Sequence, residues 1–304
     1  LAVCEQDREL LGGTAFACLL MLKHLFLALA PLFFVYLLRG YCCPDVPKSK
    51  NSSTRKSTRD GGRVAMDPAP RWSRLASKLG LERLSFARLT ALGSVVLGVF
   101  GLCLGPLCVS DGLSVATCAR QLEKLSTRLF PFGSRGLVHA YWAPNVWALY
   151  LFSDRMLLTA LKFLIFPSGS GGYVGSTTGG LVRTVIMAVL PSVPTSACLL
   201  LSLLACFPAL HGAWKRPTPT TFVWGVVHCS LSSFLWGFHV HEKALLIPTV
   251  VSALLAFESR AGARMHLRLC FLASFAAFPL LPGPELRILK VSFSTRMPSN
   301  IVKN

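Results

Sequence analysis

The sequence predicts an all-α protein that crosses a membrane several times. Of its 304 residues, 53% are hydrophobic and only 14% are charged, whereas about 25% of the residues in a typical soluble domain are charged. Apolar runs of about 20 residues, the length that a helix needs to span a bilayer, recur along the chain. This composition argues against a water-soluble enzyme.

The charged residues are strongly unbalanced, with 31 Lys and Arg against 13 Asp and Glu and a formal net charge of +18. A basic balance can indicate nucleic-acid binding, but apolar runs of this length favour a bilayer. We therefore expect membrane lipid to be a partner of this chain, and nucleic acid not to be one.

Residues 1–38 are expected to form one bent N-terminal membrane helix or two shorter ones. The apolar run Leu11–Leu38 is interrupted by Lys23-His24, and Pro31 is expected to kink it. The two polar residues either snorkel at a helix boundary or line a polar cavity. Because the chain starts at Leu1 and no basic region precedes the first apolar run, we expect it to be part of a longer protein.

Residues 39–88 differ in composition from everything around them. This segment holds twelve Lys and Arg against four Asp and Glu, so 12 − 4 = +8. Its polar core is expected to be disordered, and the positive-inside rule places it in the cytoplasm. The sequon Asn51-Ser52-Ser53 is therefore not expected to be glycosylated.

Residues 89–290 are expected to form a multi-span membrane region, followed by an irregular tail at 291–304. The clearest spans are Leu89–Val109, Val193–Trp214 and Pro217–Phe238, which contain no Lys, Arg, Asp or Glu. Alternate crossings from the cytoplasmic segment place residues 110–190 and 239–243 on the lumenal side. Within them, Trp142–Phe166 is expected to be an interfacial or re-entrant helix.

The eleven cysteines lie mostly in apolar runs, where cysteine behaves as a small hydrophobic residue. Because there is no C-x-x-C pair, we expect neither a zinc site nor a disulfide framework. Cys42-Cys43 follows an apolar run, which favours unmodified juxtamembrane cysteines, with S-palmitoylation as the alternative.

Two segments on the lumenal side combine residue types that bind ligands. The first, Arg128–Tyr150, is rich in arginine and aromatic residues. Composition favours an interface belt with snorkelling arginines, and the alternative is a site in which arginines bind phosphate. Its candidate residues are Arg128, Arg135, His139, Tyr141, Trp142, Asn145 and Trp147.

The second segment, His239–Lys243 (HVHEK), is a tight turn between two spans. Ionisable groups at membrane depth indicate function by default. The favoured interpretation is anion or phosphate binding, with Lys243 and a histidine as donors and Glu242 holding Lys243. The alternatives are an exposed Glu242–Lys243 pair and a metal site, for which a third ligand at suitable spacing is missing.

These segments also resemble a known family. The strings RLFPF-x₂-RGL-x-HAYWAPN-x-WALY and SSF-x-x-G-x-HVHEKA, with shorter matches at Leu22–Cys42, Leu190–Thr195 and Pro279–Leu286, are similar to the endoplasmic-reticulum glucosyltransferases that use dolichyl phosphate glucose. Within that family the chain most resembles the member that adds the second glucose. The similarity runs over most of Leu11–Lys290.

The resemblance implies part of a C-type glycosyltransferase fold, in a multi-pass protein of the endoplasmic reticulum membrane whose active face is lumenal. It implies inverting α-1,3 transfer of glucose from dolichyl phosphate glucose to the monoglucosylated, dolichyl-diphosphate-linked oligosaccharide. An acidic general base is expected, together with cationic stabilisation of the phosphate leaving group. No metal or other cofactor is expected.

The resemblance also assigns roles to residues. His239, His241, Glu242 and Lys243 fall on the HVHEKA motif and are expected to bind the donor phosphate. The residues expected to bind donor and acceptor are Arg128, Arg135, His139, Tyr141, Trp142, Asn145 and Trp147. The catalytic base is expected in a first lumenal loop that this chain lacks, so the chain alone is expected to be inactive. The alternatives are the sibling that adds the first glucose and a non-catalytic multi-pass membrane protein or transporter, although no internal repeat of the transporter kind is found.

Overall fold

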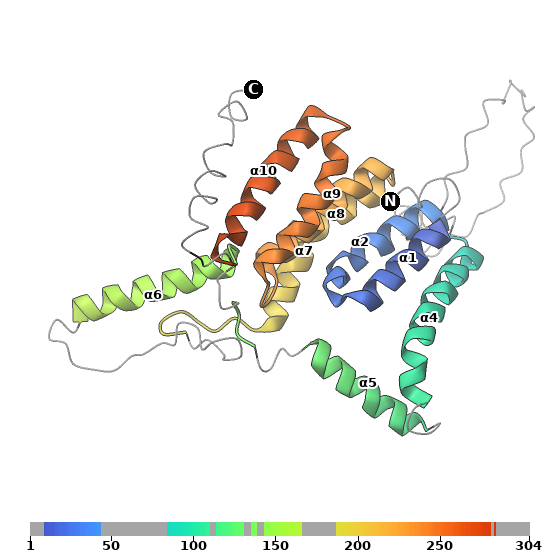
Figure 1. The fold of residues 1–304 in the computed structure, drawn as a ribbon, viewed down its shortest axis with the longest axis horizontal. Coiled ribbons are helices and arrows are strands. Elements are labelled where there is room, and N and C mark those ends of the chain that lie inside the picture. The colour runs from blue at the N-terminus through green and yellow to red at the C-terminus, as the bar shows by residue number, and fades with distance from the viewer. Residues whose placement is uncertain are drawn as a thin grey trace, which may run out of the picture.

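The computed structural model describes residues 9–43, 84–109, 114–130, 135–138, 143–165, 187–280 and 283. All regular elements in these ranges are helical, which confirms the predicted fold class (Figure 1). They are α1 (Glu9–Leu22), η2 (His24–Leu29), α2 (Ala30–Leu37), η3 (Leu38–Cys42), α4 (Phe86–Val109), α5 (Val115–Leu129), α6 (Val146–Ile165), α7 (Thr195–Lys215), α8 (Pro219–Trp236), η4 (Glu242–Leu245), α9 (Leu246–Ala256), α10 (Arg260–Ala277) and η5 (Phe278–Leu280).

Three helical stretches among the described residues are long and apolar enough to cross a membrane: His24–Cys42, Phe86–Val109 and Thr195–Lys215. The second and third follow the expected spans Leu89–Val109 and Val193–Trp214 closely. The expected span Pro217–Phe238 forms α8, which is not one of the three, because its sequence includes one histidine and three serines.

The run Leu11–Leu38 forms two helical arms instead of one long helix. The chain turns at Lys23, and α1 returns along α2, so that the rings of Phe16 and Phe33 stack with their centroids 3.7 Å apart. Pro31 does not kink a helix as expected. It lies in the first turn of α2, where a proline lacks no needed hydrogen bond, and the chain changes there from a 3₁₀ to an α-helix.

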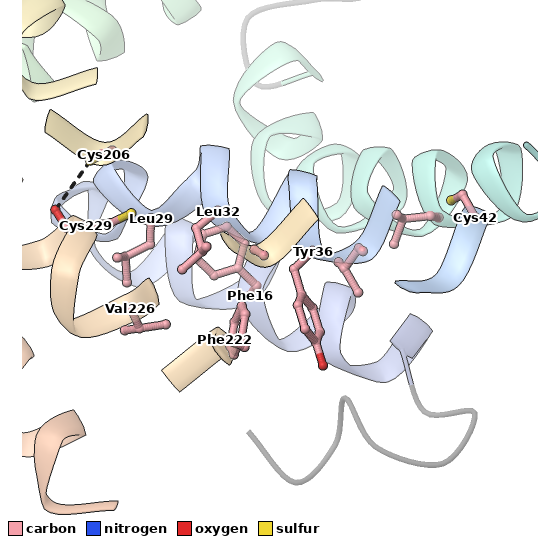
Figure 2. Packing of buried hydrophobic residues seen from close by; sticks show 12 residues of the cluster. Phe16, Leu29, Leu32, Tyr36, Cys42, Cys206, Phe222, Val226 and Cys229 are labelled. Carbon is pink, nitrogen blue, oxygen red and sulfur yellow. Dashed lines mark hydrogen bonds between the residues drawn. The ribbon is translucent and has the colours of Figure 1, made fainter. Parts of the chain in front are cut away.

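The largest buried cluster joins the N-terminal arms to α7 and α8 (Figure 2). Leu32 and Phe222 are almost fully buried in it, and the ring of Phe222 contacts those of Phe33 and Tyr36. The thiol of Cys206 on α7 lies 3.8 Å from the carbonyl oxygen of Cys229 on α8. The cluster therefore connects segments that are about 200 residues apart in the chain.

From α7 onward, successive helices pack side by side, α7 on α8, α8 on α9 and α9 on α10 (Figure 1). Ser259 caps α10 by accepting a hydrogen bond from the backbone N–H of Gly262. Farther along α9 and α10, the hydroxyl of Ser252 lies 3.0 Å from Nδ1 of His266. These short connections place the α8–α9 turn at one end of the bundle and the α9–α10 turn at the other.

The two ends of the basic segment 39–88 meet in space. The backbone N–H of Ser85 donates to the carbonyl of Cys42 at 2.9 Å. Arg88 donates to the carbonyl of Tyr41 at 3.0 Å, and its guanidinium carbon lies 5.3 Å from the centre of the Tyr41 ring. Residues 44–83, which carry the predicted disorder, lie outside the described residues.

The cysteines include buried thiols and one disulfide among the described residues. Cys42 and Cys43 are buried, with exposures of 0% and 1%, which favours the unmodified interpretation because a buried thiol is inaccessible to an acylating enzyme. Cys108 and Cys118, however, form a disulfide between the end of α4 and the first turns of α5. The sequence analysis expected no disulfide framework and did not predict this pair, because it relied on spacing in the sequence, whereas Cys108 and Cys118 lie at the end of one helix and the start of the next.

Candidate functional site

The two segments singled out in the sequence meet at His239. Nδ1 of His239 lies 2.8 Å from the carbonyl oxygen of Gly136, and its backbone N–H donates to the carbonyl of Leu137 at 2.9 Å. Because a carbonyl oxygen only accepts, Nδ1 carries the proton and Nε2 points elsewhere. The histidine turn is thus bound to the arginine- and aromatic-rich segment across 103 residues of chain.

Local backbone geometry explains the shape of the His239–Lys243 turn. Helix α8 ends where the N–H of Gly237 donates to the carbonyl of Ser233, and a β-carbon at Gly237 would collide with that same oxygen. Two residues later His239 has φ of 52°, a positive value that non-glycine residues rarely adopt. Such conformations persist only where surrounding contacts hold them, as Gly136 and Leu137 do here.

The rest of the turn divides its side chains between the interior and the surface. Glu242 is only 4% exposed, whereas His241 and Lys243 are exposed. The rings of His239 and His241 meet edge to face at 5.8 Å. The burial of Glu242 argues against the interpretation of this turn as an exposed Glu242–Lys243 pair.

Two residues of the aromatic-rich segment anchor the start of α6. Asn145 is 4% exposed, and its Oδ1 caps the helix by accepting from the N–H of Ala148. Its Nδ2 has no hydrogen-bond partner within the described part of the chain. Trp147 is also 4% exposed, and its indole N–H donates to the carbonyl of Trp236 at the end of α8. Trp147 is therefore buried between helices and is not part of an open interface belt.

The remaining predicted site residues fall in different places. Arg135 directly precedes Gly136 and is exposed beside the turn. Arg128 lies on α5, which packs against α4 and not against this cluster. His139, Tyr141 and Trp142 lie outside the described residues.

A buried polar contact on α6 was not predicted from the sequence. Asp154 on α6 is fully buried, and its carboxylate accepts hydrogen bonds of 2.8 to 3.2 Å from the backbone N–H groups of Ala188, Val189 and Leu190. Burial alone would raise the pKa of Asp154, but these hydrogen bonds and the charge of Arg155 together lower it below the usual value. A lone aspartate within an apolar 20-residue helix was the signal that could have identified it.

The segment 187–194 makes a second contact with α6. The hydroxyl of Tyr150 donates to the carbonyl of Pro191 at 2.9 Å, one helical turn before Asp154. Residues 187–194 are thereby fixed along α6 and lead directly into α7. The start of α6, the end of α8 and the residues that lead into α7 therefore pack together.

The sequence as a whole identifies the family. A family model described as the ALG6, ALG8 glycosyltransferase family matches residues 1–302.

The chain belongs to this family.

Several curated relatives carry one and the same name, dolichyl pyrophosphate Glc1Man9GlcNAc2 alpha-1,3-glucosyltransferase. The chain is 39% identical over 287 residues to that of Mus musculus, 36% over 280 residues to that of Neurospora crassa and 34% over 293 residues to that of Arabidopsis thaliana. These matches cover 92–94% of the chain but only 47–48% of each relative. The chain thus spans about half the length of the curated relatives it matches.

In this member of the ALG6, ALG8 family, the described part of the site offers donors suited to an anion. The imidazoles of His239 and His241, the ammonium group of Lys243 and the guanidinium group of Arg135 all lie on or beside one turn. No group of three His, Cys, Asp or Glu side chains that could hold a metal ion occurs among the residues described. The arrangement is able to neutralise a phosphate.

Proposed function

We propose that the protein transfers glucose from dolichyl phosphate glucose to the monoglucosylated, dolichyl-diphosphate-linked oligosaccharide, forming an α-1,3 bond with inversion. It works as a multi-pass protein of the endoplasmic reticulum membrane with its active face in the lumen. Family membership and the acceptor in the relatives' printed name support this proposal. The observation that carries it is the contact of His239 with Gly136, which joins the two motif segments into one site.

The donor phosphate is bound at the histidine turn in this proposal. Lys243 and His241 are exposed there, so both can reach a ligand in the lumen. Cationic and N–H donors placed in advance around a leaving phosphate stabilise the charge that develops on it. Glu242 is buried in the same turn, and we assign it to hold Lys243 and His241 in place.

The sugar side of the site uses Asn145 and Trp147 in different ways. Asn145 already caps α6 with its oxygen, and we assign its amide N–H₂ to a hydroxyl of donor or acceptor sugar. Trp147 is bonded to the backbone of Trp236 and acts as a positioning residue that holds α6 against α8. The acidic general base is assigned to the part of the relatives that this chain does not match.

A chimera tests the proposal. Residues 9–280 of this chain replace the matching half of the Mus musculus relative, and the chimera is expressed in cells that lack that relative. Lipid-linked oligosaccharides are then separated by mass. We expect the monoglucosylated intermediate to disappear and the diglucosylated one to form.

The outcomes separate the alternatives. Conversion of the unglucosylated oligosaccharide to the monoglucosylated one would assign the chain to the enzyme that adds the first glucose. Persistence of the monoglucosylated intermediate, with the chimera present in the membrane at normal abundance, would reject the proposed acceptor. A chimera with Lys243→Ala should convert at least about tenfold more slowly, which corresponds to 1.4 kcal/mol of lost transition-state stabilisation.

A further inference from the structure

Helix α5 has an apolar face that the protein leaves uncovered. Its apolar residues recur at intervals of three and four, the helical repeat, at Val115, Cys118, Leu122, Leu125 and Leu129. None of its residues is buried in the described structure, and Val115 is 89% exposed. Figure 1 shows α5 below the other helices, beginning beside the end of α4 and lying apart from α7–α10. An exposed apolar face of this kind marks a surface that binds something else.

The opposite face of α5 is cationic. Arg120, Lys124 and Arg128 follow one another at intervals of four residues, so they form a row along one side of the helix. Glu123 is the one acid in α5, which gives the helix a net charge of 3 − 1 = +2. A helix with an apolar face and a basic polar face is the type that lies in the interface plane of a bilayer.

Both ends of α5 are tied to the ends of membrane-length helices. At its start, the Cys108–Cys118 disulfide holds the first turns to the end of α4, with the two α-carbons 4.2 Å apart. Just past its end, the ring of Phe130 packs edge to face on His24, which begins the stretch His24–Cys42. A helix of about 22 Å that is fixed at both ends to span termini lies along the membrane surface, not across it.

The surface of α4 continues into that of α5. Leu92 is the buried residue in α4, whereas Leu97 and Leu102 are 72% and 80% exposed. Because α4 is long and apolar enough to cross a membrane, these exposed leucines are suited to contact acyl chains. The apolar face of α5 therefore continues a surface that is suited to lipid.

The disulfide also indicates the side of the membrane. Disulfides form in the lumen of the endoplasmic reticulum and are rare in the cytosol. The basic segment 39–88, at the other end of α4, favours the cytoplasm by its charge. Two unrelated properties, thiol chemistry and charge, therefore place α5 on the lumenal surface.

We propose that α5 is an interfacial helix in the lumenal leaflet, with its apolar face in the acyl-chain boundary and its row of Arg120, Lys124 and Arg128 among phospholipid head groups. The Cys108–Cys118 disulfide sets the corner between α4 and α5. This role is independent of glucose transfer, and it removes Arg128 from the ligand site.

The test places a diazirine amino acid at single positions of the full chain, produced through the secretory pathway and reconstituted into phosphatidylcholine vesicles. After illumination, mass spectrometry counts lipid adducts. Leu122 reports the apolar face, Lys124 is its matched control on the polar face two residues away, and Leu97 calibrates a lipid-facing position. We expect adducts at Leu122 to exceed those at Lys124 by at least about fivefold.

Two results would overturn the proposal. Equal adducts at Leu122 and Lys124 would show that α5 is not oriented on the bilayer, and protein adducts at Leu122 would show that another polypeptide covers it. A second arm repeats the measurement with Cys108→Ser. The ratio should fall toward one, and an unchanged ratio would reject the disulfide as the element that fixes the corner. Mass-tagging with maleimide before and after reduction should detect Cys108 and Cys118 only after reduction.

Discussion

Asp154 shows how one side chain fixes a length of backbone. Its buried carboxylate replaces the hydrogen-bond partners that Ala188, Val189 and Leu190 would otherwise find in a helix or in water. Three donors from consecutive residues aimed at one carboxylate favour its ionised form and lower its pKa. The interaction therefore depends on charge as well as on shape.

The variant Asp154→Asn should lower the free energy of unfolding by about 2–4 kcal/mol, because a charged acceptor is lost and an amide N–H₂ group faces other donors. Thermal unfolding in detergent measures the change. Ser153→Ala is the matched control, since Ser153 is exposed and its hydroxyl bonds only within α6. Equal melting temperatures for Asp154→Asn and the control would contradict this account.

The lowered pKa of Asp154 also predicts a pH dependence. A carboxyl group whose pKa is lower in the folded state contributes stability above its unfolded value, about 3.9, and loses that contribution as the pH falls through the folded value. The stability gap between the natural chain and Asp154→Asn should therefore be full at pH 7 and shrink below about pH 4. A gap that grows on acidification would reverse the assigned sign.

His239 combines an unusual backbone with a functional imidazole, and substitutions separate the two. Asparagine tolerates positive φ, so His239→Asn should change the unfolding free energy by no more than about 1 kcal/mol while transfer by the chimera falls at least about tenfold. His239→Ala should lose stability as well. His211→Asn, at an exposed position on α7, is the control, and normal transfer by both His239 variants would remove this residue from the site.

At the scale of an element, the end of α8 depends on the absence of a side chain. A β-carbon at Gly237 would collide with the carbonyl of Ser233 and approach Val240 to 2.6 Å, so Gly237→Ala must move the histidine turn. We expect it to destabilise the chain by about 2–3 kcal/mol through strain. Gly98→Ala in α4 meets nothing within 4 Å and should be neutral or stabilising by up to about 1 kcal/mol.

Melting temperatures of the two alanine variants distinguish a steric clash at Gly237 from an effect of any glycine-to-alanine change. If both variants lose the same stability, then the close approach at Gly237 is not the reason that glycine is needed there. If only Gly237→Ala loses stability, its transfer activity in the chimera should fall too, because His239 follows two residues later.

The elements that the sequence predicted well are those whose length reflects the bilayer. Leu89–Val109 and α4, or Val193–Trp214 and α7, agree within three residues at each end, because an uncharged apolar run of about 20 residues has few other uses. The pairing of Cys108 with Cys118 and the clamp on Asp154 were not predictable in this way. Both depend on how separate segments meet in space, which neither composition nor periodicity records.

The candidate site was predicted only in part, because composition identifies segments but not the contacts between them. His239–Lys243 was recognisable as a polar turn between apolar runs, and the aromatic-rich segment by its composition. Their contact joins the side chain of His239 to the backbone carbonyl of Gly136, and a backbone acceptor leaves no trace in side-chain patterns. The structural roles of Asn145 and Trp147 as cap and bridge likewise became visible only with the helices in place.

For the whole molecule, orientation is the property that joins the separate proposals. The proposed cytoplasmic placement of segment 39–88 and the proposed lumenal placement of the disulfide and of the site share one premise, that α4 runs from the cytoplasm to the lumen. If α4 ran the other way, both α5 and His239–Lys243 would lie on the opposite side of the membrane from the one proposed. A measurement of orientation at one residue therefore tests all of these placements.

The sequon at Asn51 is a built-in reporter of that orientation. In cells, Asn51 should remain without glycan, because the proposed topology keeps the segment in the cytoplasm. Replacing Lys48, Lys50, Arg55, Lys56 and Arg59 with glutamine removes five positive charges and should let a fraction of molecules insert in reverse. That fraction would show a gel shift sensitive to an endoglycosidase and absent from the Asn51→Gln version. A glycan on Asn51 of the natural chain would contradict the proposed topology.

The contact between the two ends of the basic segment 39–88 has a practical consequence. Because Ser85 is hydrogen-bonded to Cys42 and Arg88 contacts Tyr41, the described residues on either side of 44–83 lie next to each other. Lengthening a loop with fixed ends costs little, about 0.6 kcal/mol for each doubling. A rigid soluble protein could therefore be inserted between residues 44 and 83 as a fiducial marker for single-particle imaging, leaving the histidine turn untouched at the opposite end of the bundle.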